Sequence, residues 1–204
     1  MSFLSNLFGG ESSDDEPDLE TRIATLEAEA EQGDSGHRGM SLNRAGDLAL
    51  QADQSERAIA FYGRAINAYL DDQHVDAARG VANKIVRVHP EAVRTQCTLI
   101  WLDLAARHMA TALLHLRDYV EAAKRSNHQD LAVGQIHLMA QLAPFEEFLA
   151  AAADALDQLN RHDMADEVRE FATGEESPNV IHDEQKLAEA CMRAATRITA
   201  EPRD

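Results

Sequence analysis

The chain has 204 residues, of which 36 are acidic and 19 are basic, so its formal net charge is −17. A charge this negative argues against binding to nucleic acid, whose phosphates are held by Lys and Arg, and against electrostatic attachment to anionic lipid. The apolar fraction of 45% is sufficient for a folded core. The aromatic fraction of only 5% and the many alanines favour packed helices over a sheet.

The expected compartment follows from what the sequence lacks. It contains no apolar run of 18 residues, which a membrane-spanning helix would need. No basic residue precedes the short apolar stretch at the N-terminus, so we expect no secretory signal. The two cysteines, Cys97 and Cys191, make no disulfide framework. These features, with a composition that resembles bacterial proteins in its Ala, Asp and Arg, predict a cytoplasmic protein.

Residues 1–16 are predicted to form a tail, either disordered or a short amphipathic and acidic segment. Four apolar side chains near its start have almost helical spacing: Phe3, Leu4, Leu7 and Phe8. They are candidates for docking in a partner's groove. A weak contact with a membrane surface is an alternative, weak because no basic residue accompanies them.

Residues 17–40 are predicted to contain one helix and a linker. In the range 18–31, Leu19, Ile23, Leu26 and Ala30 form one narrow apolar stripe at helical spacing. The glycines between Gly33 and Gly39 predict a flexible link to the next domain.

The region 41–173 has few helix-breaking residues, which predicts an almost continuous series of helices joined by short turns. The expected helices are 41–52, 55–70, 74–88, 91–108, 110–124, 128–141, 145–159 and 161–173. Residues 174–180 are a predicted linker. Residues 181–204 are predicted to form a last helix (181–199) and a tail.

Residues 34 positions apart share their character in the middle of the chain. Ala78 and Ala112 are one such pair, and Val86 and Val120 are another. Small residues at 78 and 112 would let two helices cross closely. The spacing of apolar and small residues from 65 up to Pro90 resembles a tetratricopeptide repeat, and the resemblance continues over 92–124 and 126–158.

This resemblance implies an all-α fold, namely a short right-handed solenoid of tetratricopeptide-like helix pairs with capping helices. A second register, in which 41–52 pairs with 55–70, fits the same pattern and stays open. The glycines Gly46, Gly63 and Gly80 are spaced by half a repeat and suggest further close helix contacts. The helices 18–31 and 181–199 are each apolar along one stripe, which suits a cap, or alternatively docking on a partner or a second copy.

No catalytic or metal-binding motif is visible. The nine histidines have no recognised ligand spacing, and both cysteines fall inside predicted helices. We therefore expect no enzymatic activity, no cofactor and no metal ion. The interpretation without a functional role is that the histidines are scattered over the protein surface.

In the family that the chain resembles, the first helix of each pair lines an inner groove. This correspondence implies a partner-binding groove lined by Asn67, Arg94, Trp101, His128 and Gln135. Trp101 is the only tryptophan and a natural anchor, and the polar side chains can bind the backbone or carboxylate of a bound peptide. The alternatives are a core position for Trp101 and simple solvation for the other four.

The predicted function is that of a non-enzymatic adaptor or scaffold, which binds a protein or peptide through the concave face of the array. One alternative is a structural subunit that self-assembles through its terminal helices. A less favoured one is a ligand- or metal-binding enzyme that uses the histidines. The oligomeric state stays open.

Overall fold

The protein is described by a computed structural model that covers residues 18–143, 145–174 and 177–200. Within these residues the chain forms ten helices and no strand, so the predicted all-α class is confirmed. The helices are α1 Leu19–Gln32, α2 Ser35–Gln51, α3 Ser55–Asp71, α4 Val75–Val88, α5 Val93–Ala105, α6 Met109–Arg125, α7 Gln129–Leu142, α8 Glu146–Gln158, α9 His162–Thr173 and α10 Glu184–Ala200.

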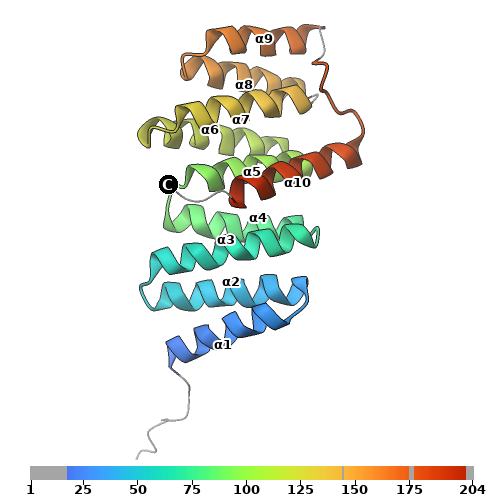
Figure 1. Ribbon diagram of the computed structural model, residues 1–204. Helices are drawn as coiled ribbons and strands as arrows, with labels where there is room; N and C mark the ends of the chain where they lie inside the picture. Colours follow the sequence, from blue (N-terminus) through green and yellow to red (C-terminus); the bar gives the residue numbers. More distant parts are fainter. Residues whose placement is uncertain (1–17, 144, 175–176, 201–204) are drawn as a thin grey trace, which may run out of the picture.

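Nine of these helices stack in one row in chain order, each against the next, from α1 to α9 (Figure 1). The tenth breaks this order. After α9 the chain runs back along the row, and α10 packs on α5 and α3, in the middle of the row (Figure 1). The helix expected to cap the end of the array therefore covers a side of it instead, and α9 is the last helix of the row.

Contacts between side chains 34 residues apart run along the row. Four hydrogen bonds have this separation, and they join Gln54 to Glu20, Arg125 to Glu91, Trp101 to Gln135, and Lys124 to Gln158. Ala78 and Ala112, the small pair with the same spacing, are both fully buried. The 34-residue spacing in the sequence is thus also a spacing of contacts in space.

Five turns between helices of the row share one backbone geometry, and none of them has a glycine at its central position. Their central residues, Asp53, Gln73, Arg107, Asn127 and Asn160, have φ between 57° and 61°. The next amide bonds to a carbonyl five residues earlier, as in His74 N to Tyr69 O at 2.8 Å. This closes the helix end in the manner of a Schellman motif. Since glycine is the usual signal for such an end, the sequence alone gave little warning of this geometry.

The predicted flexible link at residues 33–39 is wrong, because α2 already begins at Ser35. The Asp34 side chain caps the helix by accepting a hydrogen bond from the His37 amide at 3.0 Å. Gly39 then lies inside the helix against Tyr69, whose ring would be 2.8 Å from a Cβ at that position. Close packing, rather than flexibility, accounts for this glycine.

The expectation of close helix contacts at the spaced glycines holds at one position and fails at another. A Cβ at Gly46 would lie 2.5 Å from the ring of Tyr62. That ring is buried, and its hydroxyl donates to Asp47 Oδ1 at 2.7 Å, so it has little freedom to move. Gly80 is exposed, and a Cβ there would have no neighbour within 4 Å.

We therefore expect opposite effects from the same substitution at these two positions. Gly46→Ala should lower the free energy of unfolding by about 1–3 kcal/mol, because the methyl group overpacks the contact with Tyr62. Gly80→Ala should raise it by about 0.5–1 kcal/mol, because alanine is the better residue inside an exposed helix. Urea denaturation followed by circular dichroism measures both, and equal effects of the two substitutions would contradict the packing described here.

Candidate functional site

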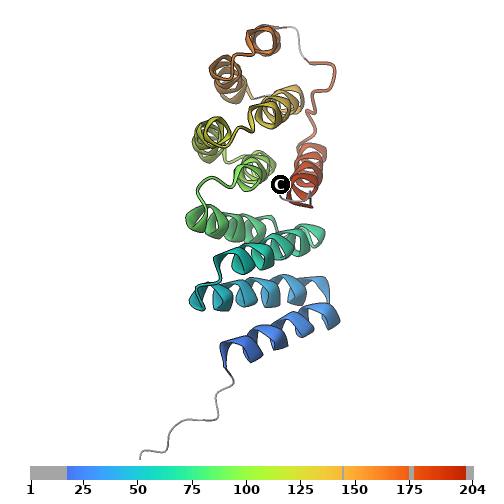
Figure 2. The same ribbon diagram turned by 60° about the vertical axis from the view of Figure 1, so that its left-hand side comes forward.

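Helix α5 is buried on all sides, which is unusual for a helix in a single row. Every residue from 96 to 104 is buried. A helix covered only by its neighbours in the row would expose one polar face to water. Here α4 and α6 cover part of α5, and α10 lies on the opposite side of α5 from α6 (Figure 2). We call the side of α5 beneath α10 the inner face.

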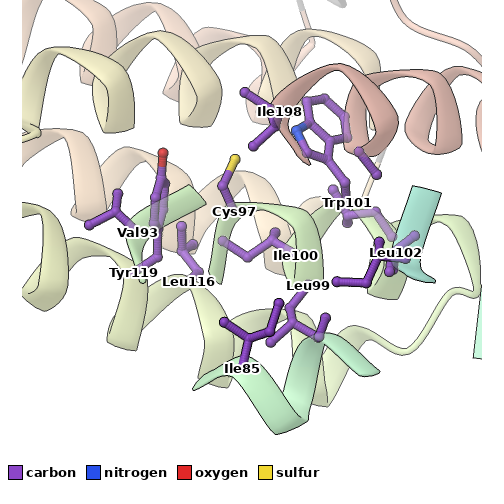
Figure 3. Close-up of a cluster of buried hydrophobic side chains, with 14 of the residues drawn as sticks. Ile85, Val93, Cys97, Leu99, Ile100, Trp101, Leu102, Leu116, Tyr119 and Ile198 are labelled. Carbon is purple, nitrogen blue, oxygen red and sulfur yellow. The ribbon is translucent and has the colours of Figure 1, made fainter. Parts of the chain in front are cut away.

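The contact between α10 and the inner face is made by one apolar stripe. Leu187, Cys191, Ala195 and Ile198 of α10 are between 0% and 3% exposed. The apolar stripe predicted from the sequence for this helix was Leu187, Cys191, Ala194 and Ile198. In the structure Ala195 takes the buried place expected for Ala194, which is only partly buried. Figure 3 shows Ile198 beside Trp101 and above Cys97 of α5. The two large residues of the stripe stand at its ends, and the two small ones lie between them.

Trp101 is fully buried in this contact. Its indole Nε1 donates a hydrogen bond to Gln135 Oε1 of α7 at 3.0 Å, and Cys97 Sγ lies 3.8 Å from the same oxygen. Of the two roles considered for Trp101, the structure therefore gives it the core position. Trp101 and Gln135, both predicted to line the groove, are joined by this hydrogen bond, and Trp101 lies beneath α10 rather than in an open cleft (Figure 3).

The other predicted groove residues lie on three different helices. Asn67 of α3 is partly buried, and its Oδ1 has no hydrogen-bond partner among the described residues. Arg94 is partly buried in the first turn of α5. His128 precedes α7, with Nδ1 3.0 Å from Ser126 Oγ. The N-terminal docking candidates Phe3, Leu4, Leu7 and Phe8 lie outside the described residues.

Two polar contacts supplement the apolar stripe of α10. Thr199 Oγ1 lies 3.0 Å from Thr98 Oγ1 of α5, and Glu184 pairs with Arg107. The Arg107 and Glu184 side chains are 55% and 74% exposed, and so we expect this pair to contribute well under 1 kcal/mol. Asp183 caps the helix by accepting from the Lys186 amide at 2.8 Å.

Open hollows flank α10 on the row. One, of about 590 Å³, is lined on the α3 side by Leu70, Asp71 and Gln73 and on the α10 side by Met192, Arg193 and Arg197. The other, of about 320 Å³, lies near the start of α10 and includes Leu104, Phe145 and Leu187. The edges of α10 are therefore not sealed against the row.

A buried carboxylate joins three helices on the far side of α5. Asp103 is 0% exposed, and its Oδ2 lies 2.6 Å from His115 Nδ1 of α6. Its Oδ1 lies 3.4 Å from Arg79 Nη1 of α4. This cluster was not predicted from the sequence, in which the histidines were interpreted as scattered over the surface. One feature of the sequence could have predicted the cluster: an acidic residue lies between Leu102 and Leu104 in a run that is buried, and a buried acid needs a partner.

Other histidines are paired in the same way. His137 Nε2 lies 3.0 Å from Glu167 Oε2, and His162 Nδ1 lies 2.6 Å from Asp157 Oδ1. In the part of the chain that the structure describes, no group of three or more His, Cys, Asp or Glu side chains could hold a metal ion. Each of these pairs connects two helices of the row.

Loss of the buried carboxylate should destabilise the row. We expect Asp103→Ala to lower the free energy of unfolding by about 3–5 kcal/mol, because Arg79 and His115 both lose their contact with a fully buried carboxylate. Asp76→Ala is the matched control: Asp76 also pairs with Arg79, at 3.0 Å, but its side chain is 85% exposed. Its loss should change stability by less than about 1 kcal/mol in the same urea titration. Similar losses for both variants would contradict the structural role of Asp103.

Trp101→Ala should act on stability rather than on binding alone. Removal of a fully buried indole leaves a cavity and takes the Nε1 donor away from the Gln135 oxygen, so we expect a loss of stability of about 3–5 kcal/mol. Thermal unfolding followed by circular dichroism measures it. A melting temperature equal to that of the wild type would show that Trp101 is exposed in solution, against the structure.

Comparisons with known proteins add no identification. No family model, curated protein or solved structure matches this chain. Among the described residues, no helix combines the length and the apolar character needed to cross a membrane.

Proposed function

We propose that this protein is a non-enzymatic adaptor with tetratricopeptide-like architecture, which binds a protein partner on the inner face of its helix row. One observation carries the proposal: the inner face of α5 already holds an amphipathic helix, α10, through an apolar stripe. A surface that packs on one helix with side chains 0–3% exposed has the shape and chemistry to pack on another.

The repeat geometry supports the architectural part of the proposal. The turn residues Gln73 and Arg107 have the same left-handed conformation and are 34 positions apart. The hydrogen bond between Trp101 and Gln135 connects positions with the same separation. Stacked repeats bring equivalent positions together in this way.

The contacts of the charged residues favour an adaptor over an enzyme. Asp103, the most buried acid described, has Arg79 against one oxygen and His115 against the other. Such a group ties helices together and has little capacity left for catalysis. Both cysteines are buried and neither forms a disulfide, which suits the reducing cytoplasm proposed for the protein.

The self-assembly alternative receives less support from the packing. It required the apolar stripes of the terminal helices to face another copy. The α1 stripe of Ile23, Leu26 and Ala30 is buried in the helix row, and the α10 stripe is buried on the row. Light scattering after size exclusion tests this ranking, with a mass of 22.5 kDa expected for a monomer.

Affinity purification from the native lysate with two matched variants tests the proposed binding face. Arg94→Glu changes a partly buried residue of α5, and Arg117→Glu makes the same change on α6, where the side chain is 69% exposed. We expect wild type and Arg117→Glu to retain the same stoichiometric partner, and Arg94→Glu to lose it at least about tenfold.

Two outcomes would contradict the proposal. One is recovery of the protein alone, without a stoichiometric partner. The other is a partner retained equally by all three proteins, which would move binding away from α5. Circular dichroism of each variant confirms that the fold is intact before the comparison is made.

A further inference from the structure

We propose that α10 is a displaceable cover, and that the partner of this protein replaces it with a basic amphipathic helix of its own. The inference rests on the proposed function and specifies it: the ligand is a helix with α10-like chemistry.

The position of α10 makes it separable from the row. Helices α1 to α9 pack on one another in sequence. Helix α10 is not a member of this row and instead packs on α5 and α3 from the side, on the inner face (Figure 2). The segment before it is attached by a backbone bond from Ile181 N to Leu142 O at 3.0 Å. Removing α10 from α5 would leave the contacts of α1 to α9 unchanged, as expected for a unit that opens locally.

The stripe defines what a replacement helix must present. Small residues in the middle of the stripe let the helix backbone approach α5, and a large residue stands at each end, as in Leu187, Cys191, Ala195 and Ile198. Ile198, at one end, lies beside Trp101 (Figure 3). A partner helix therefore needs apolar residues at relative positions 0, 4, 8 and 11, with the middle two small. A larger residue or a charge in the middle would be excluded.

The charge of α10 defines the rest of the partner. Residues 184–200 contain three basic and two acidic side chains, so this helix is positive on a chain with net charge −17. Arg193 and Arg197 of α10 line the same hollow as Asp71 of α3, together with a single acidic residue of α10, Glu189. The acidic row thus favours a basic helix, and the open edges of α10 give an incoming helix access to the site.

Trp101 provides the readout, since it is the only tryptophan and lies beneath α10. In the full-length protein, Ala195→Asp places a charge in the buried middle of the stripe. We expect its tryptophan emission to shift to longer wavelength and become sensitive to acrylamide, with the helical signal of the row retained. Gln185→Asp makes the same change of charge at an exposed position of α10 and should leave the emission unchanged.

A synthetic peptide of residues 184–200, with three basic and two acidic side chains, is then the probe of the vacated face. It should bind the Ala195→Asp protein, restore the wild-type emission and bind more weakly as salt is raised. The same peptide carrying Ala195→Asp should bind at least about tenfold more weakly. Unchanged emission in the Ala195→Asp protein, or an opened protein that does not bind the wild-type peptide, would overturn the proposal.

Thiol labelling of the wild type covers the case in which Ala195→Asp fails to fold. Burial raises the pKa of Cys191 to about 12, so this thiol stays protonated and unreactive while α10 is docked. We expect Cys191 to be labelled at least about tenfold faster than global unfolding allows. Labelling at the rate of global unfolding would overturn the proposal.

The results separate this inference from the adaptor function. A natural partner retained equally by wild type and Ala195→Asp, and not displaced by the 184–200 peptide, would overturn displacement and leave the adaptor in place. Peptide binding to the opened protein without any natural partner in the lysate would support the helix-binding face and overturn the adaptor.

Discussion

The inner face of α5 cannot be left in water, and the arrangement of the C-terminal third of the chain follows from that constraint. Trp101 and Cys97 are both fully buried although α5 belongs to a row one helix pair deep. The burial of an indole contributes roughly 1.5–3 kcal/mol, so an uncovered α5 would be costly. The chain covers this face with its own last helix, brought back from the far end of the row.

The stability that α10 gains by packing on α5 is limited by the small size of its buried side chains. Only Leu187 and Ile198 of the α10 stripe are large, and the small residues between them bury little area. At about 25 cal/mol per Å² such a stripe gives a few kcal/mol before the ordering of the helix is subtracted. The row itself is also held by buried charged contacts, since Asp103 of α5 contacts side chains of both α4 and α6. The row and its cover therefore differ in stability, which is what displacement requires.

The helices could be predicted from the sequence because their signals are local. Apolar spacing and turn residues located all ten, with ends displaced by a few residues for most of them. The clearest error, the link at 33–39, came from treating glycine as flexible where the ring of Tyr69 requires a residue without Cβ. That requirement comes from another helix, 30 positions away, and leaves no mark beside the glycine itself.

The site was predictable only in part for a similar reason. The 34-residue spacing brought Trp101 and Gln135 into one predicted set, and they do form a hydrogen bond. Whether Trp101 is open or covered depends on where α10 packs, which no local pattern encodes. The apolar stripe of α10 showed that it needs a surface, but an end of the row and its inner face satisfy that need equally well in the sequence.

Hydrogen exchange across the full-length protein, followed by mass spectrometry, tests the central claim most directly. If α10 is a separable cover on a stable row, the amides of α10 will exchange well before those of α3 and α5, under conditions in which the row stays folded. If α10 exchanges together with α5, at the rate of global unfolding, then the two form one cooperative unit and the account of a displaceable cover is wrong.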